Sequence, residues 1–202
     1  MTPYSGLLFF YLMGLLLLPA IVLGLLGKSL GGYGLFFSAA MLAVVFGING
    51  QLLQLAAFYL WQMVLFLIFR RLRPGRLWPV TLALLPLLLL KIGEVWEPLS
   101  IFQLLGVSYM TFRAVEVLVN LRDGTVRELS LFQWSYFLLF FPSVSSGPID
   151  RCRRFLVDLE KRPTQAEYLA LLRQGVWKLV GGVFSAIVLS GLIWQHWLSP
   201  LP

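Results

Sequence analysis

Long apolar runs constrain the fold of this chain more than any other feature. A helix needs about 20 apolar residues to cross the hydrocarbon core of a bilayer, and residues 6–26 and 51–69 supply them. Shorter runs occupy residues 33–48 and 77–92, and we expect the second of these to bend at Pro86. Only 12% of the residues are charged, against about 25% in soluble domains. The sequence therefore predicts an all-α, polytopic integral membrane protein with one transmembrane domain over its 202 residues.

Basic residues predict the orientation. The loop at 70–76 carries four arginines and no acidic residue. They are Arg70, Arg71, Arg73 and Arg76. By the positive-inside rule this loop faces the cytoplasm, which places the N-terminus outside a multi-pass cell-membrane protein. The net charge of +7 then fits cytoplasmic loops and anionic headgroups of the lipid bilayer. It does not indicate nucleic-acid binding, because no basic surface is interleaved with aromatic residues that stack on bases.

The fifth apolar run, residues 98–121, is unusual because it contains charged side chains. An arginine inside a membrane normally faces a bundle interior or water and finds a partner. Arg113 and Glu116 are three residues apart, which places them on one face of a helix. Two interpretations stay open: a structural ion pair that joins helices, or the lining of a substrate path. A turn at residues 122–124 returns the chain to the cytoplasm.

A re-entrant segment is predicted over residues 131–150. Residues 131–142 are apolar but too short to cross the membrane. The turn at residues 122–124 precedes them on the cytoplasmic side, and five basic residues against two acidic ones in 151–162 place the other flank there too. The polar stretch after Pro142 either satisfies its own backbone through serine hydroxyls or forms a polar constriction open to the cytoplasm. A last run, residues 168–194, is expected to cross outward and to end at interfacial tryptophans.

The sequence offers few groups for catalysis. The single histidine, His196, lies in a Trp-rich helix end and lacks a nearby carboxylate to orient it, so we expect an interfacial residue rather than a base. The single cysteine, Cys152, is expected to be a cytoplasmic bystander rather than a nucleophile. No metal, nucleotide or hydrolase motif is present, so we predict no metal site.

Two stretches resemble a known family. LGVSYMTFRAVEVLVNLRDG (105–124) and LFFPSVSSGPIDRCRRF (139–155) are similar to the membrane-bound O-acyltransferase family, especially to its members that D-alanylate teichoic acids. The resemblance implies a ring of helices around a thin, funnel-shaped centre. It implies transfer of D-alanine from the phosphopantetheine thioester of a D-alanyl carrier protein, at the cytoplasmic face, to hydroxyls of a teichoic-acid acceptor outside. No bound cofactor is implied.

The same resemblance suggests which residues line the substrate path. These are Tyr109, Thr111, Arg113, Glu116, Ser145, Ser146, Gly147, Pro148, Asp150 and Arg151. The candidates for docking the carrier protein or lipid are Arg70, Arg71, Arg73, Arg76, Arg153 and Arg154. The family's histidine belongs to a C-terminal half that nothing here matches, so we expect no catalytic residue in this chain. The chain is expected to be an N-terminal half that is inactive without its C-terminal half.

Two other classes of function remain. A membrane scaffold or accessory subunit would need no partner half, and a transporter-like protein would use the re-entrant segment as a gate. For the topology, cysteine labelling at position 125 and at Cys152 is expected to report the cytoplasmic side in both cases.

Overall fold

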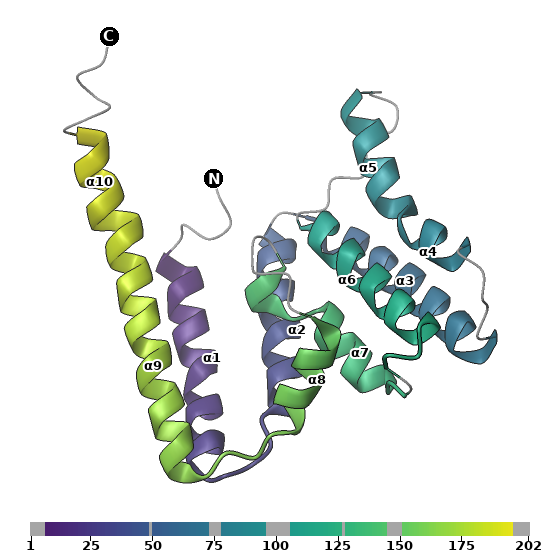
Figure 1. Ribbon diagram of the computed structural model, residues 1–202. Coiled ribbons are helices and arrows are strands. Elements are labelled where there is room, and N and C mark those ends of the chain that lie inside the picture. The colour runs from purple at the N-terminus through teal and green to yellow at the C-terminus, as the bar shows by residue number, and fades with distance from the viewer. Residues whose placement is uncertain are drawn as a thin grey trace. The chain divides into compact units, whose positions relative to one another are not determined.

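The computed structural model describes residues 7–48, 50–72, 78–95, 106–126, 128–144 and 151–195. Every regular element in these ranges is a helix, which confirms the predicted all-α class there (Figure 1). The chain divides into two compact units. The first contains Met1–Ala20 and Ser29–Lys161, and the second contains Ile21–Lys28 and Arg162–Pro202.

Three apolar helices form where the N-terminal runs predict them. They are α1 (Leu7–Leu25), α2 (Gly31–Ile48) and α3 (Leu52–Leu72). The turn after α2 needs Gly50, whose φ is +67°, because side chains disfavour the left-handed region. Among the described residues, only Leu52–Arg71 is long and apolar enough to cross a membrane. Phe9–Leu25 and Gly31–Gly47 are shorter apolar helices, so composition and length alone leave the predicted number of crossings open.

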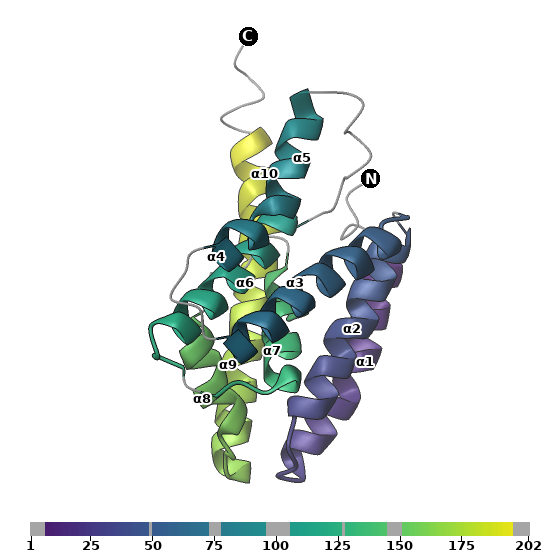
Figure 2. The ribbon, with the colours of Figure 1, turned by 90° about the vertical axis from the view of Figure 1, so that its right-hand side faces the viewer.

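The fourth apolar run forms two helices, α4 (Trp78–Ala83) and α5 (Leu85–Val95), set at an angle to each other in Figure 2. Pro86 has no N–H group to donate to the carbonyl of Leu82, so the predicted interruption has its expected cause. Side chains of α3 satisfy the carbonyls that the break leaves open. Trp61 Nε1 donates to Leu82 O at 3.0 Å, and Gln62 Nε2 donates to Ala83 O at 2.9 Å.

The core of the first unit joins α3 to α6 (Val107–Arg122) and α7 (Leu131–Leu138). Trp134 on α7 stacks on Phe66 of α3, with ring centroids 5.0 Å apart and 14° between planes. Ser130 begins α7 with a capping box closed by Gln133. At eight residues α7 is too short to cross a bilayer, as predicted for residues 131–142.

The second unit contains the helical run at the end of the chain. It consists of α9 (Gln165–Val183), the π-helical turn η3 (Phe184–Leu189) and α10 (Ser190–Ile193), and it coincides with the run predicted at 168–194. Large apolar side chains are exposed along it, including Trp177 and Trp194. Such a surface needs lipid or further protein to cover it.

Candidate functional site

The site begins where α6 begins, at Gly106. This residue has φ +70°, and a Cβ atom there would lie 2.3 Å from the carbonyl oxygen of Val144. Both the backbone conformation and the close approach therefore require glycine. The start of α6 thus contacts the end of the short 3₁₀ turn η2 (Phe141–Ser143).

Arg113 lies two turns further along α6 and is only 3% exposed. Its Nη1 donates to the carbonyl of Phe137 at 3.2 Å, and its Nη2 donates to the Ser143 hydroxyl. The guanidinium also lies 5.5 Å from the centroid of the Phe137 ring. The carbonyl of Phe137 is one of the last four of α7, which lack partners within the helix and attract positive charge. Arg113 therefore caps the C-terminus of α7.

Glu116, one turn after Arg113, performs the opposite task for α8 (Cys152–Glu160). Its Oε1 accepts from the backbone N–H of Cys152 at 2.9 Å and from Asn120 Nδ2 at 3.3 Å. Cys152 is the first residue of α8, and the N-cap residue Arg151 makes no capping hydrogen bond with its side chain. A carboxylate is favourable at a helix N-terminus, where N–H groups lack partners. Glu116 therefore caps α8 from another helix.

We call Arg113 and Glu116 the α6 clamp, because they hold the two flanks of residues 145–150. Their spacing suggests an ion pair within α6, but the hydrogen bonds of Glu116 go to α8 and Asn120. Its Oε2 atom is buried and has no hydrogen-bond partner among the described residues. The clamp thus joins the ends of α7 and α8, and the lining of a substrate path stays a prediction.

The other substrate-path candidates do not share one location. Ser145, Ser146, Gly147, Pro148 and Asp150 lie outside the described residues. Tyr109 is half-buried on the Arg113 side of α6, one turn before it, and Arg151 is exposed at the start of α8.

Thr111 does not join the clamp. It is fully buried, and its hydroxyl has no hydrogen-bond partner in the described part of the chain. At 100° per residue it lies about 200° around α6 from Arg113. Its side of the helix also carries Leu118, which packs with Leu65 and Ala83.

The environment of Cys152 excludes a reactive thiol. The residue is fully buried, and burial, with a smaller contribution from the Glu116 carboxylate, raises the pKa of its thiol to about 12. The prediction that Cys152 is no nucleophile agrees with this environment. The expectation that Cys152 would report topology by labelling is wrong, because a buried, protonated thiol reacts with label on neither side.

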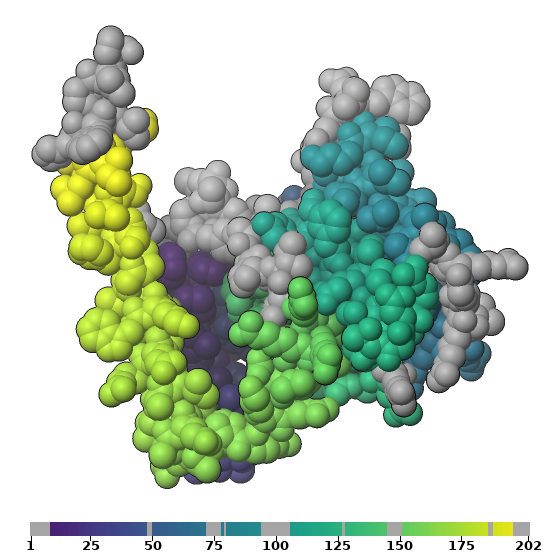
Figure 3. Space-filling model, viewed as in Figure 1, coloured from purple at the N-terminus to yellow at the C-terminus, as the bar shows by residue number. Residues whose placement is uncertain are grey.

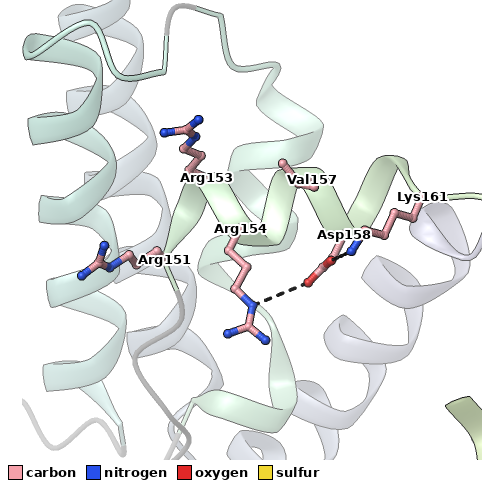
Figure 4. A pocket seen from close by; sticks show the side chains of 6 residues that line it. All are labelled: Arg151, Arg153, Arg154, Val157, Asp158 and Lys161. Carbon is pink, nitrogen blue, oxygen red and sulfur yellow. Dashed lines mark hydrogen bonds and ion pairs between the residues drawn. The ribbon is translucent and has the colours of Figure 1, made fainter.

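The docking candidates lie on two elements. Arg70 and Arg71 are exposed in the last turn of α3, where positive charge is favourable. Arg153 and Arg154 are exposed on α8 (Figure 4). Arg73, Arg76 and His196 fall outside the described residues. Within the described ranges no three His, Cys, Asp or Glu residues come together as a metal site would require.

Sequence reasoning missed four participants in the site: Gly106, the Ser143 hydroxyl, the backbone N–H of Cys152 and the Phe137 carbonyl. The hydrogen bonds of the clamp join residues 24 to 36 positions apart. No local pattern encodes such contacts. The only signal in the sequence was the pair of charges in an apolar helix. It shows that these side chains need partners, but it does not show which residues supply them.

Comparison with known proteins places these features in a family. A teichoic acid D-alanyltransferase of Bacillus subtilis is 39% identical over 218 aligned residues, which cover the whole of this chain and 55% of that protein. One from Streptococcus thermophilus is 32% identical over 212 residues, again across the whole chain and 51% of that protein. The chain belongs to this family. No family model matches it.

The chain spans about half the length of the curated relatives that it matches. A third family member, from Lacticaseibacillus rhamnosus, is 39% identical over 99 residues, or 49% of this chain. Because the first two alignments cover the whole chain, α6, α7 and α8 all lie in the part that the family shares.

Proposed function

We propose that this chain forms the membrane-embedded entrance of a teichoic acid D-alanyltransferase. In that reaction an acceptor hydroxyl attacks the carbonyl of a D-alanyl thioester. A C–O bond forms, the C–S bond breaks, and the thiol of the carrier's phosphopantetheine arm leaves with the proton. We assign to this chain the path by which the donor arrives, and not the base that removes the hydroxyl proton.

The observation that carries the proposal is the α6 clamp. Arg113 and Glu116 fix both flanks of residues 145–150 from one helix. Irregular backbone at membrane depth persists only where it is buried in protein or lines a water-filled cavity. The fixed positions of Ser143 and Cys152, on either side of residues 145–150, suit the second role, because a donor arm needs an opening of constant shape.

The orientation follows from the basic loops. We propose that the segment 131–150 enters and leaves on the cytoplasmic side, where the carrier protein presents its thioester. The multi-pass arrangement and the outside N-terminus belong to the same proposal. Arg70 and Arg71, exposed at the end of α3, are suited to attract an acidic carrier, because complementary charge accelerates encounter.

The decisive experiment supplies the remainder of the Bacillus subtilis relative in trans. Both pieces are co-expressed in a strain that lacks its own D-alanyltransferase, and D-alanine esters on teichoic acid are measured. We expect esters only when both pieces are present, and fewer esters when Arg113 is replaced by methionine. An assembled pair that never transfers D-alanine would overturn the proposal.

The rival functions give other outcomes in the same strain. A scaffold would accumulate stably and leave ester formation unchanged when it is omitted. A transporter-like protein would move a solute across vesicles that contain no carrier protein. Either result would contradict an acyl-transfer role for this chain.

A further inference from the structure

Helix α8 has two different faces. Cys152 and Phe155 are buried, and Leu156 and Leu159 are half-buried against the core of the first unit. These positions recur at the spacing of one helix face. The opposite face carries charge and takes no part in the α6 clamp.

An open depression runs over this outer face, with a volume of about 370 Å³ (Figure 4). Its lining consists of Arg151, Arg153, Arg154, Val157, Asp158 and Lys161. Four cations and one carboxylate give this surface a net charge of +3. The side chains of α8, green in Figure 3, lie at the surface of the molecule in that view.

The carboxylate occupies the centre of the basic side chains. Asp158 pairs with Lys161 at 2.7 Å and with Arg154 at 3.9 Å. All three side chains are exposed, so these pairs contribute little to stability and exchange readily with other anions. A phosphate group can therefore replace Asp158 as the partner of Arg154 and Lys161.

Val157 is the one apolar residue in the lining, and it is 53% exposed. An apolar side chain ringed by long basic side chains is typical of helices that lie in the headgroup region of a bilayer. Lys and Arg there keep their charge at the phosphates while their aliphatic stems lie along apolar surface.

We propose that the outer face of α8 binds the phosphate of an anionic phospholipid in the cytoplasmic leaflet. The inference rests on the membrane embedding and orientation in the proposed function, but it does not depend on acyl transfer. An acidic protein is the other partner that the charge allows. A stable protein interface buries about 800 Å² on each partner and uses aromatic anchors, and the lining of this depression contains no aromatic residue.

Native mass spectrometry of the full chain in neutral detergent tests the proposal. The probes are phosphatidylglycerol, with phosphatidylcholine as the uncharged comparison. Each basic residue near a membrane surface is worth about fivefold in affinity. We therefore expect Arg153→Gln with Arg154→Gln to weaken phosphatidylglycerol binding more than tenfold. We expect Asp158→Asn to strengthen it by up to about fivefold.

Matched controls separate this site from general charge and from misfolding. Lys28→Gln with Arg122→Gln removes two exposed cations elsewhere and should leave phosphatidylglycerol binding unchanged. Because Asp158→Asn must act in the direction opposite to the arginine variants, a loss of folding cannot imitate the expected pattern.

Several results would overturn the proposal. One is that the α8 variants bind phosphatidylglycerol as tightly as the unaltered chain. This holds also if the variants capture an acidic carrier protein less well. Another is that phosphatidylcholine binds as tightly as phosphatidylglycerol. A third is that inorganic phosphate, at the same concentration as the lipid, displaces phosphatidylglycerol, which would make the site a free-phosphate site. Phosphatidylglycerol binding in a chain that never supports D-alanyl transfer would contradict the proposed function and leave this inference standing.

Discussion

Replacing Arg113 by methionine removes the cap on α7 and keeps an unbranched side chain over the Phe137 ring. The variant loses the hydrogen bonds that the cation donates to the carbonyls of Phe137 and Phe140 and to the Ser143 hydroxyl. Each such bond contributes about 1.5–3 kcal/mol. Much of this loss is offset, because the methionine variant does not have the free-energy cost of burying a cation away from water. We expect a net local loss of about 2 kcal/mol, or about 30-fold in the opening equilibrium.

Hydrogen–deuterium exchange in lipid nanodiscs measures this opening. The reporting amides are those of Ser143 and Val144, which donate to the carbonyls of Phe140 and Phe141 at 3.2 Å and 3.1 Å. Both should exchange about 30-fold faster in Arg113→Met. The amides of α3 should keep their rates, because the loss is local.

Arg122→Met is the matched control, because it removes an arginine from the same helix. Arg122 pairs with Asp123 at 2.8 Å on the exposed end of α6. A surface pair of this kind is worth about 0–1 kcal/mol. Unchanged exchange in Arg113→Met, or an equal acceleration in Arg122→Met, would refute the clamp.

Two further predictions concern other parts of the site. Gly106→Ala places a Cβ atom 2.3 Å from Val144 O in a left-handed residue, and should cost at least about 2 kcal/mol. It should lower the melting temperature, whereas Gly14→Ala, with open space around the new atom, should not. A stable Gly106→Ala protein would contradict the close packing of α6 on η2. Cys152 should resist maleimide at pH 7–8 until the protein unfolds. Because folding raises its thiol pKa to about 12, the folded state keeps a proton that the unfolded state loses above about 8.5. Stability should therefore fall as pH rises from about 8.5 toward 12, and Cys152→Ala should make that fall shallower. Rapid labelling of the folded protein would show that the thiol is accessible.

The N-terminal helices were predictable because one physical constraint determines them. An uninterrupted apolar run has few alternatives to a helix, so the runs 6–26, 33–48 and 51–69 correspond to α1, α2 and α3 within three residues at each end. Pro86 predicted the interruption for the same reason, because its missing N–H is a local property. The sequence did not predict that Trp61 and Gln62 donate hydrogen bonds to the carbonyls that this interruption leaves without partners.

The clamp marks the limit of sequence reasoning. The charges in α6 showed that Arg113 and Glu116 need partners, and their spacing suggested that they serve each other. The structure pairs them with helix ends that the chain reaches only 24 to 36 residues later. Burial of Cys152 is likewise a result of packing, since its sequence neighbours Arg151 and Arg153 are both exposed.

Labelling from the two sides of the membrane tests the central claim, that both flanks of the proposed re-entrant segment, residues 131–150, face the cytoplasm. Cys152→Ala provides the background, and single cysteines at the exposed positions Thr125 and Arg153 replace the buried native thiol as reporters. We predict that a membrane-impermeant maleimide reacts with both in inside-out vesicles and with neither in intact cells. Reaction of the two positions from opposite sides would contradict the re-entrant segment, and with it the proposed path for the acyl donor.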